Sequence, residues 1–311
     1  MIQKPCVLIT GGAGFIGSHI ADRFHANGYR VVVVDNLTTG KPDHLPADVC
    51  LYEADIQDRP AMEEIFDREK PDYLVHEAAQ ISVSRSVREP ETDAGINVLG
   101  FIHVLECAVR HKVQKVVFAS SGGVLYGEVE EPAKEDHPLR PASPYGVTKL
   151  AGEWYLHYYA KQYGLPYVAL RYANVYGPRQ DPNGEAGVVA IFAQALLRGE
   201  APTIFGDGSC IRDYVYVEDV ARANLLALER NVSNRAFNIG TGVATDVNRL
   251  FQMIAELSGS SIEPLYGPPR PGDLQRSVLD CEQAARELGW RPQVQLAEGL
   301  QRTIDWFRKF S

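Results

Sequence analysis

Cysteine is scarce in this chain of 311 residues, and its five cysteines are scattered. They form no CxxC pair of the kind found in zinc sites and redox motifs, and no framework that would indicate disulfides. Their positions are Cys6, Cys50, Cys107, Cys210 and Cys281. We therefore expect buried thiols in a reducing, cytoplasmic compartment, and no metal site.

Long apolar runs and an excess of positive charge are also missing. No run approaches the ~20 apolar residues that a membrane span needs, and the chain enters an apolar segment at once, without a signal-peptide pattern. The net charge is −9, which gives the surface no general attraction for nucleic acid. We expect neither a membrane nor a nucleic-acid partner, so an anionic ligand must be held by local arginines and backbone N–H groups.

Short apolar segments alternate with helix-length segments in the first half of the chain. Examples of the apolar segments are "CVLIT" (6–10), "VVVVD" (31–35) and "KVVFAS" (115–120). Strands that are buried on both faces read as continuous apolar runs, and β–α alternation predicts a parallel sheet covered by helices. The pattern indicates an α/β fold with a Rossmann-type, doubly wound sheet.

The alternation stops in the second half, where proline and glycine cluster between probable helices and "AFNIGT" (236–241) reads as one more strand. We expect residues 1–173, with a returning segment near 214–241, to form a nucleotide-binding domain. Residues 174–213 and 242–311 would form a smaller α/β subdomain that binds the substrate.

A glycine-rich turn follows the first strand and opens a helix. Gly11, Gly14 and Gly17 have GxxGxxG spacing, which allows a tight turn and close approach of a diphosphate to the helix N-terminus. Asp35 ends the second strand 18 residues later, near the place where a carboxylate accepts from the adenosine ribose; capping the turn "DNLTTG" (35–40) is the alternative. Residues 36–39 supply no cation for a 2′-phosphate, so the pattern favours NAD over NADP.

Tyr145 and Lys149 lie four residues apart in a helix that is predicted to start at Pro144, after the N-cap Ser143, and to end before Gly164. The spacing places both side chains on one helical face. A free tyrosine, with a pKa of about 10, is a poor base, and a nearby ammonium and an oxidised nicotinamide would lower that pKa. An isolated YxxxK pattern usually marks the exposed surface of an amphipathic helix. In a chain that also has a dinucleotide turn and a strand ending in two serines, it indicates that Tyr145 is a catalytic base.

Ordered motifs run along essentially the whole chain. They include "TGGAGFIGSH" (10–19), "HEAAQ" (76–80), "SSGGVLYGE" (120–128), "RYANVYGPRQ" (171–180) and "RPGD" (270–273). Together with "YGVTK" they resemble the extended short-chain dehydrogenase/reductase family, and most closely its UDP-glucose (UDP-galactose) 4-epimerase branch. The resemblance implies NAD as cofactor, a UDP-sugar as substrate and a homodimer. Apolar faces of the 96–111 and 144–163 helices could form that dimer or face the sheet.

The resemblance also implies roles for the matched residues. The NAD site would comprise the three glycines with Phe15, Ile16, Asp35, Asn36, Asp55, Ile56, Ala78, Asn97, Tyr145, Lys149 and Tyr172. The substrate would contact Ser121, Tyr145, Asn174, Val188, Ile204, Phe205, Arg212, Arg270, Asp273 and Ser277. Arg212 and Arg270 suit a diphosphate because a guanidinium makes charge-assisted, bidentate bonds; surface ion pairs are their alternative role.

One position departs from the family pattern. The family places its catalytic Ser or Thr four residues before the Tyr of "YG", where this chain has Gly122. The nearest hydroxyl is that of Ser121, so we expect Ser121 to take the role, with Ser120 or an ordered water as alternatives. Gly122 and Gly123 would permit the backbone shift that this requires.

The resemblance implies a reaction at C4 of the sugar. Tyr145 would take the proton of the 4-OH while C4 passes hydride to NAD, and the keto sugar would turn and be reduced on its other face. The small Ser277 would leave room for an N-acetyl group. The alternatives are a UDP-glucuronate 4-epimerase and a decarboxylase or 4,6-dehydratase, and Gly123 and Val124 argue against a dehydratase, which needs carboxylates there. A non-catalytic NAD-binding regulator is a remote alternative, since such proteins typically lack the Tyr or the Lys.

Overall fold

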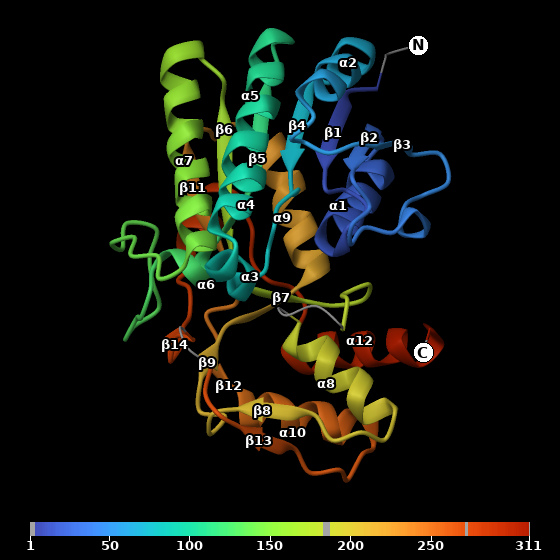
Figure 1. Ribbon diagram of the computed structural model, residues 1–311, viewed down its shortest axis with the longest axis vertical. Helices are drawn as coiled ribbons and strands as arrows, with labels where there is room; N and C mark the ends of the chain where they lie inside the picture. The colour runs from blue at the N-terminus through green and yellow to red at the C-terminus, as the bar shows by residue number, and fades with distance from the viewer. Residues whose placement is uncertain (1–3, 183–186, 271–272, 311) are drawn as a thin grey trace.

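A seven-stranded parallel sheet organises the larger part of the molecule (Figure 1). The computed structural model describes residues 4–182, 187–270 and 273–310. The strand order is β11-β6-β5-β4-β1-β2-β3. The strands are β1 (Cys6–Thr10), β2 (Arg30–Asp35), β3 (Cys50–Glu53), β4 (Tyr73–His76), β5 (Lys115–Ser121), β6 (Tyr167–Tyr172) and β11 (Arg235–Ile239). The predicted Rossmann-type, doubly wound sheet is confirmed.

Helices cover both faces of this sheet because alternate side chains of each strand point to opposite sides. Val7 and Ile9 of β1 pack with one set of helices, α1 (Phe15–Ala26) and α9 (Val217–Glu229). Leu8 packs with the other set, α2 (Arg59–Glu69), α5 (Phe101–Arg110) and α7 (Pro144–Tyr163). Short helices α3 (Val83–Arg88), α4 (Pro90–Ala94), α6 (Gly122–Leu125), a π-helical turn (Gly95–Gly100) and a 3-10 turn (Pro42–His44) lie in the connections.

The smaller part has its own apolar core, formed mainly by three helices. These are α8 (Val188–Leu197), α10 (Val247–Ser258) and α12 (Leu296–Phe310). Short strands surround them, and they pair as β10 (Tyr214–Tyr216) with β7 (Asn174–Tyr176), as β13 (Leu265–Gly267) with β8 (Thr203–Phe205), and as β12 (Thr245–Asp246) with β9 (Ile211–Arg212) and β14 (Arg276–Ser277). Figure 1 shows this part below the carboxyl ends of the large sheet.

Residues 281–290 are placed differently from the expected division at residue 242. Helix α11 (Glu282–Glu287) packs against β11, and the fully buried Trp290 joins the core beside the large sheet. Trp290 Nε1 donates to the Asp219 carbonyl at 2.9 Å. A large indole that finds both an apolar site and a hydrogen-bond acceptor there draws the segment to the nucleotide-binding domain.

Within the described residues, one helical stretch, Pro90–Arg110, is long and apolar enough to cross a membrane by length and composition alone. Its residue Phe101 is fully buried and stacks on His76 and Phe118, whose ring centroids lie 4.3 and 4.8 Å away. The apolar character of the stretch is thus explained by its packing against the sheet.

Candidate active site

The predicted site residues gather at the carboxyl edge of the large sheet. Because all seven strands are parallel, the residues that follow them lie along one edge. The neighbours of β1 are β2 on one side and β4 on the other, so the chain winds outward in both directions from this point. Such a switch point leaves a crevice outside the strand ends, where open α/β sheets bind ligands.

The glycine-rich turn leaves no space for side chains. A Cβ atom on Gly17 would lie 2.1 Å from the Gly11 carbonyl oxygen, and one on Gly11 would lie 2.6 Å from Ala78 N. Gly11 also has a φ of 68°, which favours glycine. No side chain caps the first turn of α1, so its N–H groups are free to bind phosphate. The turn therefore fits a dinucleotide, with Phe15 and Ile16 in that first helical turn.

Asp35 already has two backbone partners. Its carboxylate accepts from Ala13 N at 3.0 Å and from Leu37 N at 2.9 Å, so it does hold the turn that follows β2. A carboxylate has room for about four hydrogen bonds, and contact with a ribose stays a prediction. Asn36 Nδ2 donates to Asp55 Oδ2 at 2.9 Å, which brings together two more predicted cofactor residues.

Asn97 is buried in a network of polar side chains and is not exposed on the surface of the crevice. Its Oδ1 accepts from Gln80 N at 2.8 Å, and its Nδ2 lies within hydrogen-bond distance of Asp93 and Thr148. Thr148 Oγ1 also donates to Asp93 Oδ2 at 2.9 Å. The network joins the π-helical turn to α7, and no pattern in the sequence singles out Asp93 or Thr148. The neighbouring Ile56 is buried against Gly100.

Tyr145 and Lys149 share one side of α7, as predicted. Ser143 accepts from Gly146 N and Gly164 ends the helix with a φ of 69°, which confirms the predicted helix boundaries. The Lys149 ammonium is buried, donates to the Ala119 carbonyl at 2.8 Å and lies 5.8 Å from the centre of the Tyr145 ring.

Burial dominates the protonation of this pair. It lowers the pKa of Lys149 to about 8, although the negative charges of Glu77 and Asp93 oppose the change. Burial raises the pKa of Tyr145 well above its ordinary value, and the charges of Asp93 and Glu77 raise it further. In the protein alone Tyr145 is therefore a protonated phenol, and Lys149 by itself does not turn it into a base.

The two serines that end β5 point to opposite sides of the sheet. Ser120 is buried, and its hydroxyl donates to Glu153 Oε1 at 2.5 Å. Glu153 also binds Arg171 through two hydrogen bonds of 2.9 and 2.7 Å. Ser120 thus belongs to a structural ion-pair network under α7.

Ser121 is half-buried at the start of α6 and caps no backbone group there. A Cβ atom on Gly123 would lie 3.8 Å from both Ser121 Oγ and Asn174 Oδ1, so these two predicted substrate contacts face a common space. A Cβ atom on Gly122 would lie 2.6 Å from the Leu279 side chain, which explains the glycine at the position where the family has a hydroxyl. Of the two serines, Ser121 is the one whose hydroxyl makes no hydrogen bond within the described part of the chain.

The remaining predicted substrate residues form two groups in the smaller part. Arg212 and the buried Ser277 are direct partners across β9 and β14. The Arg270 guanidinium stacks on Phe205, 4.0 Å from the ring centre, and the neighbouring Ile204 is buried in the core of the smaller part. Val188 opens α8. Asp273 N donates to the Arg270 carbonyl, while Pro271 and Gly272 lie outside the described residues.

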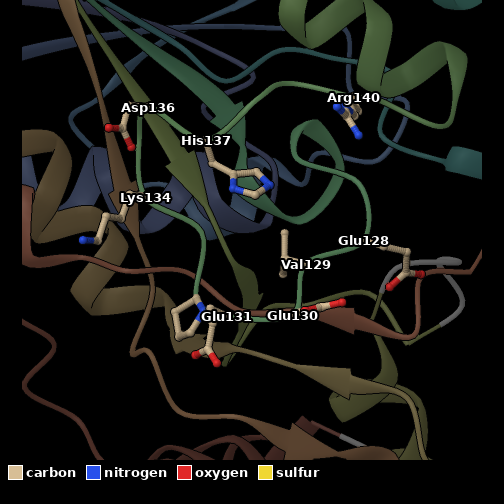
Figure 2. Close-up of a pocket in the computed structure, with 9 residues that line it drawn as sticks. Glu128, Val129, Glu130, Glu131, Lys134, Asp136, His137 and Arg140 are labelled. Carbon is tan, nitrogen blue, oxygen red and sulfur yellow. The ribbon is translucent and has the colours of Figure 1, made fainter.

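A hollow of about 470 Å³ lies in the loop between α6 and α7. Figure 2 shows its mixed lining of acidic and basic side chains, among them Glu128, Lys134, His137 and Arg140. None of the predicted substrate residues lines it. Its rim residue Glu128 accepts from Gln275 N and Arg276 N at 2.6 and 3.1 Å, and so ties the loop to β14 next to Ser277.

The fold and the site define a nucleotide-binding α/β protein with a short-chain dehydrogenase/reductase pair of Tyr and Lys. A family model described as the NAD dependent epimerase/dehydratase family matches residues 7–240. The chain belongs to this family, which confirms the predicted membership and the predicted NAD cofactor.

Individual relatives extend over the whole chain. A putative UDP-glucose 4-epimerase of Methanocaldococcus jannaschii is 48% identical, over 97% of this chain and 98% of its own length. A crystal structure of the Thermotoga maritima UDP-glucose 4-epimerase with UDP-glucose is 52% identical, with a TM-score of 0.96 over 98% of this chain and 99% of that one. The Thermus thermophilus UDP-glucose 4-epimerase, in complex with NAD, is 47% identical, with a TM-score of 0.94 over 97% and 99%.

Proposed function

We propose that this protein is an NAD-dependent isomerase that interconverts UDP-glucose and UDP-galactose by inverting C4 of the sugar. The observation that carries the proposal is that the Tyr145–Lys149 pair and Ser121, which ends β5, lie at the same carboxyl edge of the sheet as a glycine turn that fits a dinucleotide. Relatives that cover nearly the whole chain and are named for this activity support it.

Each step assigns one task to the chain's own residues. Gly11, Gly14 and Gly17 would hold NAD by its diphosphate. When bound, NAD supplies the hydride acceptor and a positive ring that favours the Tyr145 phenolate. Tyr145 takes the proton of the 4-OH as C4 is oxidised, and Ser121 hydrogen-bonds the reacting oxygen. After the 4-keto sugar has presented its other face, C4 regains the hydride on that face and Tyr145 returns the proton to the oxygen.

The nucleotide must stay in place while the sugar turns. Arg212 and Arg270 come from different strands and loops of the smaller part, and both are suited to a diphosphate. Stacking on Phe205 holds the Arg270 side chain. Binding energy from this non-reacting part would anchor the molecule through the turn.

The space beside Gly123 bears on the alternative activities. Ser121 and Asn174 are the groups nearest to a Cβ atom placed there, and neither is a carboxylate. A dehydratase needs acid–base groups at this point, so the geometry favours epimerisation. The substrate of a UDP-glucuronate 4-epimerase differs from UDP-glucose only in the C6 group of the sugar. A test with each substrate therefore distinguishes the two activities.

A second substrate class is supported by Ser277. This residue is small, buried and paired with Arg212. Two residues further along the same extended segment, Leu279 packs against Gly122, so Ser277 points to the same side, toward the Ser121 loop. We propose that the space in front of it admits an N-acetyl group at C2 of the sugar.

Conversion of one sugar nucleotide to the other tests the function directly. Purified protein would be incubated separately with UDP-galactose, UDP-N-acetylgalactosamine and UDP-glucuronate, and the products separated by chromatography. Formation of UDP-glucose, with no product from the Tyr145→Phe variant, is the expected result. If the protein converts UDP-glucuronate and neither of the other two sugars, the proposed substrate is wrong.

We also propose a homodimer that pairs the outer faces of the 96–111 and 144–163 helical stretches, where the π-helical turn before α5 and helix α7 expose apolar side chains. Several apolar side chains on this side are exposed, and Leu99 is 58% and Trp154 64% exposed. The others include Val147 and Tyr158. Contiguous exposed apolar side chains of this size mark protein interfaces. Sedimentation should give twice the chain mass for the wild type, and Trp154→Glu should shift it toward the monomer.

A cytoplasmic location completes the proposal. All five cysteines are free thiols, which supports a reducing compartment. Only Cys6 and Cys107 are buried, and Cys50 is exposed rather than buried as expected. Fractionation of the source cells with an antibody against the chain would place it.

A further inference from the structure

Glu77 is an acidic group at the carboxyl edge of the large sheet to which the reaction as described assigns no task. It directly follows β4 and is half-buried. A Cβ atom on Gly11 would lie 2.9 Å from the Glu77 carbonyl carbon, so the glycine-rich turn packs against its peptide. A carboxyl group that is partly removed from water requires compensating partners.

A chain of two side chains holds this carboxyl group in place, and the first of them binds it directly. The hydroxyl of Tyr172 donates to Glu77 Oε1 at 2.8 Å. Asn224 Nδ2, on α9, donates in turn to Tyr172 Oη at 2.8 Å. Because Asn224 binds the hydroxyl oxygen, the hydroxyl hydrogen is directed toward Glu77. The carboxyl group is thus positioned by β6 and α9, far from it in sequence.

Glu77 also lies between the two halves of the NAD site. In the sheet, β4 stands between β1, which leads into the glycine turn, and β5, where Lys149 binds the Ala119 carbonyl. A dinucleotide with its diphosphate at the glycines and its reactive ring near Tyr145 must cross the end of β4. The charge of Glu77 raises the pKa of both Tyr145 and Lys149, so these reacting groups are within its electrostatic reach.

We propose that Glu77 is a cofactor-binding residue that favours oxidised over reduced NAD. The nicotinamide ring carries a positive charge when oxidised and none when reduced. A carboxylate in a partly desolvated site attracts the charged ring and gains nothing from the neutral one. The inference concerns the cofactor alone and holds whichever sugar is the substrate.

The preference depends on the ionisation of Glu77. Burial raises the pKa of Glu77 to about 7, while the Tyr172 hydrogen bond and the positive charge of Lys149 act to lower it. Below this pKa the group is largely neutral and the preference fades; above it the carboxylate is formed and the preference is complete. Lys149, with a pKa of about 8, titrates nearby, so only a variant that removes the Glu77 charge separates the two.

Equilibrium dialysis against an equimolar mixture of NAD⁺ and NADH tests the proposal on the whole protein without any sugar. Glu77→Gln keeps the size of the side chain and an oxygen that accepts from Tyr172, and removes the charge. We expect the bound ratio of NAD⁺ to NADH to fall about tenfold in this variant at about pH 8. At about pH 6, below the Glu77 pKa, wild type and variant should nearly agree.

Glu106→Gln is the matched control. Glu106 of α5 likewise accepts from a tyrosine hydroxyl, that of Tyr159. Tyr159 lies fourteen residues beyond Tyr145 on α7, about 20 Å along the helix. The control should keep the wild-type ratio. An unchanged ratio in Glu77→Gln would overturn the proposal, and so would equal weakening of both nucleotides, which is what a merely structural carboxyl group gives.

Discussion

Replacing Ser120 and Ser121 separately by alanine should damage two different properties of the protein. Ser120→Ala removes a buried hydrogen bond to the Glu153 carboxylate. Hydrogen bonds to charged groups contribute ~1.5–3 kcal/mol. Glu153 keeps both bonds from Arg171, so we expect the lower end, a loss of ~1.5–2 kcal/mol in the free energy of unfolding. That loss lowers Tm by a few degrees.

Ser121→Ala should leave stability nearly unchanged, because its hydroxyl makes no hydrogen bond to any residue that the structure describes and caps no turn of α6. The kcat of the Ser121→Ala variant should fall instead. Removing a hydrogen-bond donor from the oxygen at which charge develops costs ~10²-fold in kcat. Each variant loses one hydroxyl oxygen, and the two changed residues are neighbours in the chain. Each variant therefore serves as the control for the other.

Thermal unfolding and steady-state turnover of UDP-galactose, measured on the same preparations, give the two quantities. Ser120→Ala should unfold at lower temperature with kcat within a few-fold of wild type, and Ser121→Ala should show the reverse. The reasoning is refuted if Ser120→Ala loses more turnover at a temperature where it is fully folded. If neither variant loses turnover, a water or a backbone group assists the reacting oxygen.

Three further predictions follow from the same geometry. Tyr145→Phe should keep the fold and NAD binding and lose ~10²–10⁴-fold in kcat, because general-base catalysis is removed; near-wild-type turnover would contradict this role. Calorimetry should show strong preference for NAD over NADP, since the 2′-phosphate would meet the Asp35 carboxylate, and comparable affinities would contradict it. Ser277→Tyr should lower turnover of UDP-N-acetylgalactosamine ~5–150-fold while sparing UDP-galactose, because overfilling a packed pocket costs ~1–3 kcal/mol; an unchanged preference would show that residue 277 does not border the sugar.

Much of the fold and the outline of the site could be predicted from the sequence, because their signals are local. A run such as "VVVVD" indicates a strand buried on both faces, whatever lies next to it. The spacing of Gly11, Gly14 and Gly17 indicates close backbone packing. In the structure a Cβ atom on Gly17 would lie only 2.1 Å from the Gly11 carbonyl oxygen. The four-residue spacing of Tyr145 and Lys149 states that they share a helical face.

Other features depend on residues that are distant in sequence, and only the tertiary structure decided them. Ser120 and Ser121 are alike in the sequence, but Ser120 donates to Glu153, which Arg171 holds in place. Ser121 makes no hydrogen bond to a residue that the structure describes. Burial and neighbouring carboxylates, not the helical spacing, set the protonation of Tyr145.

The same holds for residues to which the sequence assigned no role or a different place. Trp290 joins the core of the large domain from a segment expected in the smaller one. Glu77 has no evident task in the motif "HEAAQ" (76–80) until the fold brings Tyr172, held by Asn224, beside it. Local patterns determine which elements form and which faces are apolar. Pairing between strands and helices far apart in the chain determines which polar group remains free to act.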